Sequence, residues 1–267
     1  LPLLPLAAPQ ARMQPVGHVD ANPTINAAAL EAALIAGPVM IPPKPYKLDP
    51  IEHTGRIGLI GCGVQSNLQF VGSGSHAIHI PIPANNVGSF IGNFLLNTET
   101  PNGFLYGIHF EQTTEPGYMA RWKVGNMQFG SFGHVALYLD NGIASGDGFF
   151  TGVIEECQMS SNGLAGIYGE NIGDSILIRK NVINGGTGIA LYLTQVGGAR
   201  QVVIEDNNLT SLGPQMYFVN MGQTIAHRNW CEHPAYLGNF SLKNGLNAQI
   251  ILDNCYIVPG NLYNENM

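Results

Sequence analysis

The chain has 267 residues and a formal net charge of −7, from 11 Lys plus Arg and 18 Asp plus Glu. Charged residues make up only 11% of it, against about 25% in an ordinary soluble domain, and hydrophobic residues make up 45%. The apolar content excludes a wholly disordered chain. The sparse, acidic charge argues against nucleic acid as a partner, because such binders present clustered Lys and Arg.

The chain opens on an apolar, proline-containing stretch, Leu1–Ala11, within an N-terminal arm over residues 1–17. Small apolar residues of this kind also end secretory signal peptides. Two interpretations stay open: an arm that packs on a partner or a neighbouring subunit, and a signal-peptide remnant. No run of about 20 apolar residues follows, so we expect no membrane span.

The first predicted element is a helix over Pro23–Ala36, within a capping segment over residues 18–38. Asn22 suits the N-cap and proline suits the first helical position, while Gly37 followed by proline ends the helix. Apolar residues at helical spacing predict the face that the helix buries. That face consists of Ile25, Ala28, Ala29, Ala32 and Ile35.

After the helix, short apolar runs broken by Gly or Asn continue to the C-terminus, and five of them share the pattern apolar-x-x-Asn-x-apolar, with Cys once in place of Asn. They are Ile154–Met159, Ile178–Ile183, Ile204–Leu209, Ala226–Cys231 and Ile251–Tyr256. Their fourth positions, 157, 181, 207, 229 and 254, lie 24, 26, 22 and 25 residues apart. Such a period is typical of a solenoid whose coils each add three short strands. We therefore expect an all-β parallel β-helix over residues 39–267.

Equivalent residues of successive coils stack at the strand spacing of about 4.8 Å. We therefore expect the repeated asparagines to form a structural ladder, in which each side chain bonds to the next and to nearby backbone. The ladder should contain Asn181, Asn207, Asn229 and Asn254. Two earlier copies are expected around Asn93, in Phe90–Leu95, and around Asn126.

The segment Val39–Leu48, with the sequence VMIPPKPYKL, resembles the opening of pectate-lyase-like right-handed parallel β-helices. In that family a capping helix precedes a V-x-I-P-P-G-x-Y-x-L motif. This chain departs from the motif at one position, where Lys44, followed by Pro45, replaces the usual Gly. With the repeats, the resemblance covers roughly residues 18–258. The family includes phage tailspikes and secreted polysaccharide lyases, hydrolases and epimerases. The resemblance thus implies a right-handed parallel β-helix that acts on polysaccharide, but no particular reaction.

Stacking also turns the charged positions of the repeats into outward columns of alternating sign. The third positions are Glu156, Lys180, Asp206, Arg228 and Asp253, and the second positions are Glu155, Arg179, Glu205, His227 and Leu252. One interpretation is a solvated ion-pair ladder of small energetic value. The other interpretation is a pair of catalytic carboxylates that lie one or two rungs apart. The resulting distance of about 5–10 Å is the range that glycoside hydrolysis requires. For that alternative the catalytic candidates are Glu155, Glu205, Asp206 and His227, with Arg179 and Arg228 binding an acidic sugar.

A tyrosine column follows on the next predicted strand: Tyr168, Tyr192 and Tyr217, with Tyr236 as its expected continuation. Strand alternation predicts that the preceding residues, such as Ile167, point inward and the tyrosines outward. Three interpretations stay open: a platform for sugar rings, a subunit interface, and an aromatic stack turned into the core. On the first, a glycan runs along the tyrosines beside the catalytic candidates named above.

Other polar residues carry less information. His76 and His79 flank a strand end, and two histidines alone make a poor metal site, so we expect no metal and no cofactor. His109 and Glu111 share a strand face, as residues i and i+2 must, which suits acid–base chemistry or an ordinary polar surface.

With these features, the resemblance implies a phage or phage-like tailspike, in the virion or outside the cell, that recognises a capsule or lipopolysaccharide and assembles as a homotrimer. Its N-terminal arm would then dock on other tail or spike proteins. One version of this hypothesis also cleaves the polysaccharide. The alternatives are a secreted bacterial polysaccharide lyase or glycoside hydrolase, and a non-catalytic structural spike. An enzyme predicts converging acids in a groove, whereas a pure binder predicts aromatic residues without such a pair.

Overall fold

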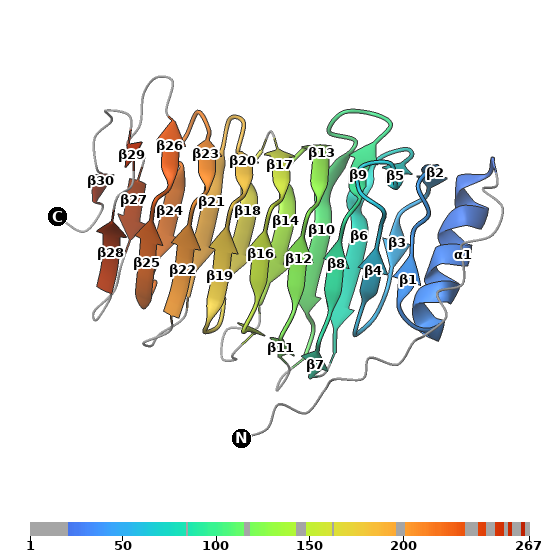
Figure 1. The fold of residues 1–267 in the computed structure, drawn as a ribbon, viewed down its shortest axis with the longest axis horizontal. Helices are drawn as coiled ribbons and strands as arrows, with labels where there is room; N and C mark the ends of the chain where they lie inside the picture. Colours follow the sequence, from blue (N-terminus) through green and yellow to red (C-terminus); the bar gives the residue numbers. More distant parts are fainter. Residues whose placement is uncertain are drawn as a thin grey trace.

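The protein is a parallel β-solenoid preceded by one short helix, as the computed structural model shows (Figure 1). It describes residues 21–83, 85–114, 118–142, 148–161, 163–195 and 201–232, together with 240–243, 249–253, 256–257 and 263–264. Each coil adds one strand to each of three long sheets, named here A, B and C, and each of these sheets has nine strands. The parallel pairing confirms the all-β parallel β-helix expected from the repeat.

Sheet A contains, in order, β1 (Val39–Met40), β4 (Gly58–Ile60), β8 (Phe90–Gly92), β12 (Lys123–Gly125), β16 (Val153–Glu155), β19 (Ile176–Arg179), β22 (Gln201–Glu205), β25 (Gln223–His227) and β28 (Gln249–Asp253). Sheet B contains β2 (Pro45–Leu48), β5 (Asn67–Phe70), β9 (Leu95–Thr98), β13 (Gln128–Phe132), β17 (Gln158–Ser161), β20 (Val182–Asn184), β23 (Asn208–Thr210), β26 (Trp230–Glu232) and β29 (Tyr256–Ile257). Sheet C contains β3 (Ile51–Glu52), β6 (Gly74–Ile82), β10 (Phe104–Gln112), β14 (Val135–Asp140), β18 (Ala165–Glu170), β21 (Ile189–Thr194), β24 (Met216–Val219), β27 (Phe240–Lys243) and β30 (Tyr263–Asn264). A small fourth sheet joins β7 (Asn86–Val87), β11 (Met119–Ala120) and β15 (Phe149–Phe150).

Helix α1 (Pro23–Ala36) has the expected bounds, and the Asn22 side chain accepts a hydrogen bond from the Thr24 amide at 3.0 Å. The helix lies at the N-terminal end of the solenoid, against β2 and β3 (Figure 1). Covering this end protects the exposed edge of the first coil from pairing with other chains. Within the described ranges, no helix is both long and apolar enough to cross a membrane.

The prediction of which face of α1 is buried is wrong. Ile25 and Ile35 are 52% and 81% exposed, whereas Leu30 and Leu34 are the large apolar side chains that pack on the solenoid. The helix is rich in alanine on every side, so apolar periodicity alone does not orient it. The two leucines, four residues apart, bury more apolar area than alanines do. Buried Asn26 adds a hydrogen bond from its Nδ2 to the Lys47 carbonyl at 2.8 Å.

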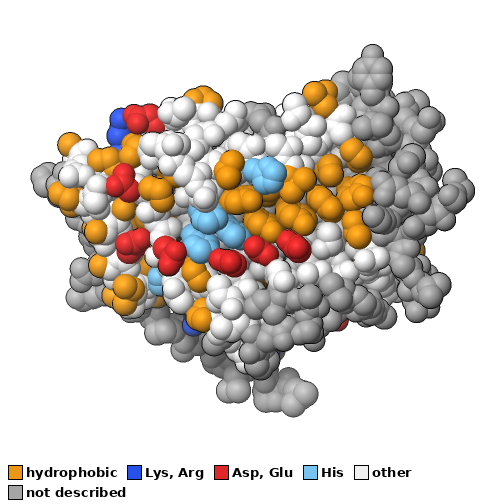
Figure 2. All heavy atoms as spheres, turned by 180° about the vertical axis from the view of Figure 1, so that it is seen from behind, with side chains coloured by type: hydrophobic (Ala, Val, Ile, Leu, Met, Phe, Trp, Pro, Cys, Tyr) orange, Lys and Arg blue, Asp and Glu red, His pale blue; other side chains and the backbone are white. Residues whose placement is uncertain are grey.

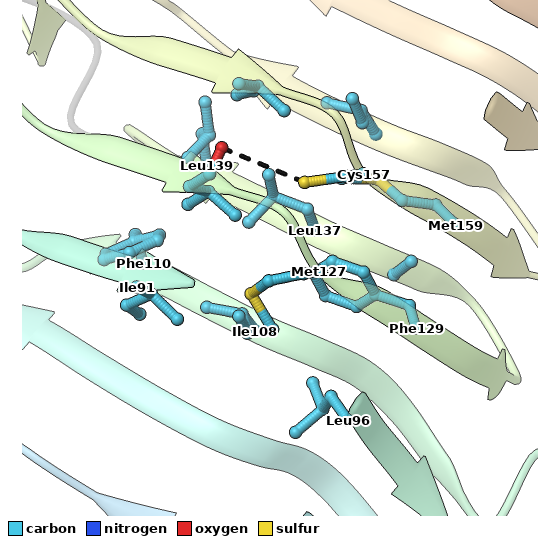
Figure 3. Packing of buried hydrophobic residues seen from close by; sticks show 14 of the residues in the cluster. Ile91, Leu96, Ile108, Phe110, Met127, Phe129, Leu137, Leu139, Cys157 and Met159 are labelled. Atoms are coloured by element: carbon cyan, nitrogen blue, oxygen red, sulfur yellow. Dashed lines mark hydrogen bonds between the residues drawn. The ribbon is translucent and has the colours of Figure 1, made fainter. Parts of the chain in front are cut away.

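The core is a continuous column of apolar side chains that all three sheets share, and Figure 3 shows part of it. Ile91 of sheet A, Leu96 of sheet B and Ile108 of sheet C point toward one another there. All three side chains are fully buried. Alternate residues of each strand therefore face this column, and the residues between them form the outer faces of the solenoid.

The asparagine ladder runs along the turn between sheets A and B. Asn181 donates from Nδ2 to Asn207 Oδ1, and Asn207 does the same to Asn229, both at 2.9 Å. Each of these asparagines also donates to a main-chain carbonyl of the preceding coil at 2.9–3.0 Å. All three are almost completely buried. The structure thus confirms the predicted ladder for these three members, and Asn254 lies outside the described residues.

Three register expectations need correction. Asn93 and Asn126 align with Glu156, one residue before the ladder position, because Gly92, Gly125 and Glu155 are paired in register. These positions have φ of 53–62°, the left-handed region that asparagine tolerates better than most residues. In the last coil, Asp253 pairs with His227 and Leu252 pairs with Ala226. The final repeat is therefore shifted by one residue, and Asp253 belongs to the column of Glu155 rather than to that of Glu156.

Candidate functional site

An unbroken row of aromatic rings runs along the outer face of sheet C. We call it the aromatic column; its members, paired in register on successive strands, are His79, His109, Tyr138, Tyr168, Tyr192 and Tyr217. Neighbouring ring centroids lie 5.2, 4.6, 4.9, 4.6 and 4.9 Å apart. These distances are close to the spacing of adjacent strands, so each coil contributes one ring. Figure 2 shows the histidines and a broad hydrophobic band on this face.

The outward direction of the tyrosines follows from the strand sequences. Ile167 and Leu191 are fully buried and Met216 is almost so, while the three tyrosines that follow them are partly exposed. This confirms the predicted alternation and rules out the interpretation of a stack turned into the core. The residue before Ile167 is a glycine because the next coil lies close to it. A Cβ on Gly166 would lie 2.3 Å from Ile183 Cγ2 and 2.9 Å from the Ala190 carbonyl oxygen.

A second row, the acid column, lies two residues further along the same strands. Glu111, Asp140 and Glu170 are paired in register, and each contacts a member of the aromatic column. His79 Nε2 lies 2.8 Å from Glu111, His109 Nε2 lies 3.1 Å from Asp140, and the Tyr138 hydroxyl donates to Glu170 at 2.7 Å. A row of acidic side chains borders the histidines and the hydrophobic band in Figure 2. The face thus offers apolar ring surfaces beside hydrogen-bond acceptors.

The electrostatics of this face keep Tyr138 and Tyr168 protonated. Burial raises the pKa of Tyr138, and the hydrogen bond to Glu170 raises it further. Burial and the charge of Glu170 likewise raise the pKa of Tyr168. A protonated tyrosine can donate a hydrogen bond to a sugar oxygen while its ring packs on sugar C–H groups. Neither hydroxyl is suited to act as a base near neutral pH.

The predicted catalytic residues lie on sheet A instead. Glu155, Arg179, Glu205, His227 and Asp253 form one outward column in register. Their charges are paired along the column, with Arg179 on Glu155 at 2.6 Å and His227 on Glu205 at 2.6 Å. In the neighbouring column, Arg228 binds Asp206 at 2.7 Å. The alternation of charge is as predicted, and the pairs form the ion-pair ladder that was one of the two interpretations.

Glu155 is the most enclosed acid of this ladder, with a side chain 11% exposed. The hydrogen bond from Lys123, together with that from Arg179, lowers its pKa below the ordinary value of 4.5, against the opposing effect of burial. Similarly, the hydrogen bond from Arg228 lowers the pKa of Asp206. Carboxylates held ionised in this way are unsuited to protonate a leaving group.

We expect Glu155→Gln to reduce the free energy of unfolding by about 2 kcal/mol at pH 7, because charged hydrogen bonds are lost. A lowered folded-state pKa means that the ionised carboxylate stabilises the fold above its unfolded pKa, and that this stabilisation is lost as the pH falls through the folded value. The difference between wild type and variant should therefore shrink below about pH 4. Denaturant titrations at several pH values measure it. Exposed Glu156→Gln is the control, and an equal loss in both variants contradicts the prediction.

The tyrosines and the predicted catalytic acids do not form one site. Tyr168, Tyr192 and Tyr217 lie on sheet C, whereas Glu155, Glu205, Asp206 and His227 lie on or directly after strands of sheet A, as do Arg179 and Arg228. Figure 1 looks onto sheet A, and Figure 2 shows the opposite side of the solenoid. The expectation that one glycan contacts both sets is therefore wrong. Tyr236 lies outside the described residues, and Ser241 holds the position next to Tyr217 on the following rung.

Several residues of the sheet C face were missed or set aside in the sequence. Tyr138, Asp140 and Glu170 were not selected, and His79 and His109 were not connected to the tyrosines. A signal was present, because strands β6, β10, β14, β18 and β21 share the pattern small–aliphatic–aromatic. The five copies are Ala77-Ile78-His79, Gly107-Ile108-His109, Ala136-Leu137-Tyr138, Gly166-Ile167-Tyr168 and Ala190-Leu191-Tyr192. Treating His and Tyr as equivalent flat rings reveals the column.

The fold has counterparts among solved structures. The chain superposes on the Agl-KA catalytic domain with a TM-score of 0.65 at 17% sequence identity, over 93% of this chain and 48% of that one. This chain therefore spans about half the length of that structure, and the similarity shows the fold alone. A weaker match is the Dettilon tailspike protein, with a TM-score of 0.34 at 10% identity over 85% of this chain and 65% of that one. Another is the A-module of Azotobacter vinelandii mannuronan C-5 epimerase AlgE4, with a TM-score of 0.38 at 10% identity over 89% of this chain and 95% of that one. No protein-family model and no curated protein matches the sequence.

Proposed function

We propose that the chain recognises a cell-surface polysaccharide, a capsule or lipopolysaccharide, along the outer face of sheet C, as part of a phage or phage-like tailspike. The observation that carries this proposal is the aromatic column, in which four tyrosines occupy consecutive strands beside a column of acids. A linear glycan is itself a repeating object, so successive sugars can meet successive rings. This setting places the protein in the virion or outside the cell.

The chemistry of the face suits sugars. Rings of tyrosine offer flat apolar surfaces to sugar C–H groups, and Glu111, Asp140 and Glu170 accept hydrogen bonds from sugar hydroxyls. A contiguous apolar surface in contact with water is costly unless something covers it. A subunit interface would also cover these tyrosines, and the two occupants are distinguished by the binding experiment below.

The same face supports cleavage in the catalytic version of the proposal. Asp140 and Glu170 lie on adjacent rungs, whose main chains are about 5 Å apart. This spacing allows two carboxyl groups to reach the separation of about 5–5.5 Å that retaining glycosidases use. The ladder acids Glu155, Glu205 and Asp206 with His227 remain a separate catalytic proposal, which requires a second glycan track on sheet A. Incubation with host polysaccharide, followed by measurement of new reducing ends and of unsaturated uronate absorbance, separates hydrolase, lyase and non-catalytic spike.

Tyr192→Ala should weaken binding of a capsule or lipopolysaccharide oligosaccharide by about 5- to 150-fold, if the roughly 1–3 kcal/mol known for aromatic stacking on bases holds for sugars. Isothermal titration calorimetry measures the change. Trp230→Ala is the matched control, because Trp230 is a 43%-exposed aromatic residue on sheet B. Unchanged affinity in Tyr192→Ala would assign the glycan site to another surface, such as a groove between subunits.

A tailspike of this kind should be a stable homotrimer. The support is the low charged fraction, 11%, which leaves few charges to keep a single chain soluble. Light scattering at micromolar concentration should give the mass of three chains. A stable monomer under these conditions would contradict the trimer and favour the secreted lyase or hydrolase alternative.

A further inference from the structure

Three histidines form a compact cluster at the N-terminal end of the aromatic column. His76 and His79 lie on β6 and His109 lies on β10, and one ring nitrogen from each lies within 4.8 Å of the others. The three ring centroids are 4.5, 4.7 and 5.2 Å apart. Each imidazole therefore contacts both of the others. The sequence spacing of His76 and His79 does not show that His109 joins them.

The strand geometry explains the cluster. Ala77 and Ile78 are both fully buried, so the simple alternation of β6 is interrupted and His76 joins His79 on the outer face. Parallel pairing then places His109 directly beside His79 on the next coil. All three rings are held by well-packed strands rather than by loops, so the cluster is organised before any ligand arrives.

His109 has the hydrogen bonding of a metal ligand. Its side chain is only 7% exposed, and Nε2 lies 3.1 Å from an oxygen of Asp140. The other ring nitrogen, Nδ1, is buried and has no hydrogen-bond partner. An imidazole that donates one N–H to a carboxylate and keeps its other nitrogen available is the usual arrangement around bound metal ions. A buried ring nitrogen without a partner is costly, and a cation there removes that cost.

The surroundings supply negative charge. His79 lies between two carboxylates, with Nδ1 3.0 Å from Glu52 and Nε2 2.8 Å from Glu111. Glu52, Glu111 and Asp140 together offset the charge of a divalent cation.

We propose that His76, His79 and His109 bind one divalent transition-metal ion of the zinc class, with Glu111 or Glu52 as a further ligand. Imidazole nitrogens favour zinc, cobalt, nickel and copper, whereas magnesium and calcium prefer all-oxygen sites. Zinc–nitrogen bonds of about 2.0–2.1 Å place tetrahedral ligands about 3.4 Å apart, so the rings must close by roughly 1 Å, which side-chain rotation provides. This site does not depend on the proposed glycan function.

The test uses the whole chain without a polyhistidine tag and Zn²⁺ alone as the probe. Isothermal titration calorimetry should show one Zn²⁺ per chain, and the unfolding temperature should rise with Zn²⁺ concentration. His76→Gln should weaken binding by more than about 100-fold, and Glu111→Gln by about 10- to 100-fold. His227→Gln on sheet A is the control and should bind Zn²⁺ as the wild type does.

Two results would overturn the proposal: no Zn²⁺ binding by the wild type at about 100 μM, or equal binding by wild type and His76→Gln. Circular dichroism establishes whether each variant is folded. Should His76→Gln fail to fold, nuclear magnetic resonance of the wild type decides instead. Zn²⁺ must then shift the ring nitrogens of His76, His79 and His109 but not that of His227, and any other pattern contradicts the site.

Discussion

Asn207→Ala is expected to lower the free energy of unfolding by about 3 kcal/mol, or roughly 150-fold in the equilibrium constant. Asn207 is 2% exposed and is the middle member of the ladder. Its Oδ1 accepts from the amide and from Nδ2 of Asn181 at 3.0 and 2.9 Å, and its Nδ2 donates to the Ile178 carbonyl at 3.0 Å. Alanine leaves these buried groups without that partner, and each unsatisfied group costs about 1–3 kcal/mol.

Guanidinium chloride denaturation followed by circular dichroism measures this loss. Hydrogen exchange localises it, because the Asn181 amide should lose protection while the amides of α1 keep theirs. The matched control is Asn208→Ala, one residue further along, where the side chain is exposed and the stability should change by less than about 0.5 kcal/mol. Coinciding unfolding curves for Asn207→Ala and Asn208→Ala would show that the ladder does not stabilise the fold.

The largest expected effect on activity is that of Glu170→Gln. If the chain cleaves its polysaccharide on sheet C, this change should reduce kcat by about 100- to 10,000-fold, the usual contribution of general acid–base catalysis. Glu170 ends strand β18, beside Asp140 on the neighbouring strand, and accepts a hydrogen bond from Tyr138. Glutamine keeps the shape and a carbonyl acceptor for that hydroxyl but cannot exchange a proton with the substrate.

Oligosaccharide binding should change by less than about threefold in Glu170→Gln, so the loss must appear in kcat rather than in KM. Glu205→Gln on sheet A provides the comparison, since the two faces are separate catalytic proposals. Loss of turnover in Glu205→Gln with normal turnover in Glu170→Gln would transfer catalysis to the ladder on sheet A. Normal turnover in both variants would mean that neither acid is catalytic. The aromatic column would then serve polysaccharide binding alone.

Much of the architecture was predictable from the sequence because it depends on local patterns that recur. The apolar-x-x-Asn-x-apolar repeat predicts stacked coils, since a residue that recurs once per coil must form a column. The same reasoning correctly predicted the ladder from Asn181 to Asn229, the alternating charges just before each ladder position and the outward tyrosines. These features need only the period of the repeat and the two-residue alternation of a strand.

Features that depend on small register differences or on weak local signals were not predictable. The predicted buried face of α1 was wrong. An alanine-rich helix has apolar residues on every side, and two leucines decide which side packs on the solenoid. The predicted register of the last repeat was wrong by one residue, since Asp253, not Leu252, pairs with His227. The coils differ in length, so the motif alone allows either residue at that position. Main-chain pairing between whole strands, not the motif, decides that register.

The sequence by itself determined that this protein is a parallel β-helix with an asparagine ladder, a charge ladder and outward tyrosines. Only the tertiary structure decided which of these share a surface. The turns between strands set the sheet to which each column belongs, and the sequence shows turn positions but not the angle between sheets. Tyr192 therefore lies with His109 and Glu170 on sheet C, while Glu205 lies on sheet A. The three histidines likewise meet only because two consecutive residues of β6 turn inward and the next coil adds His109.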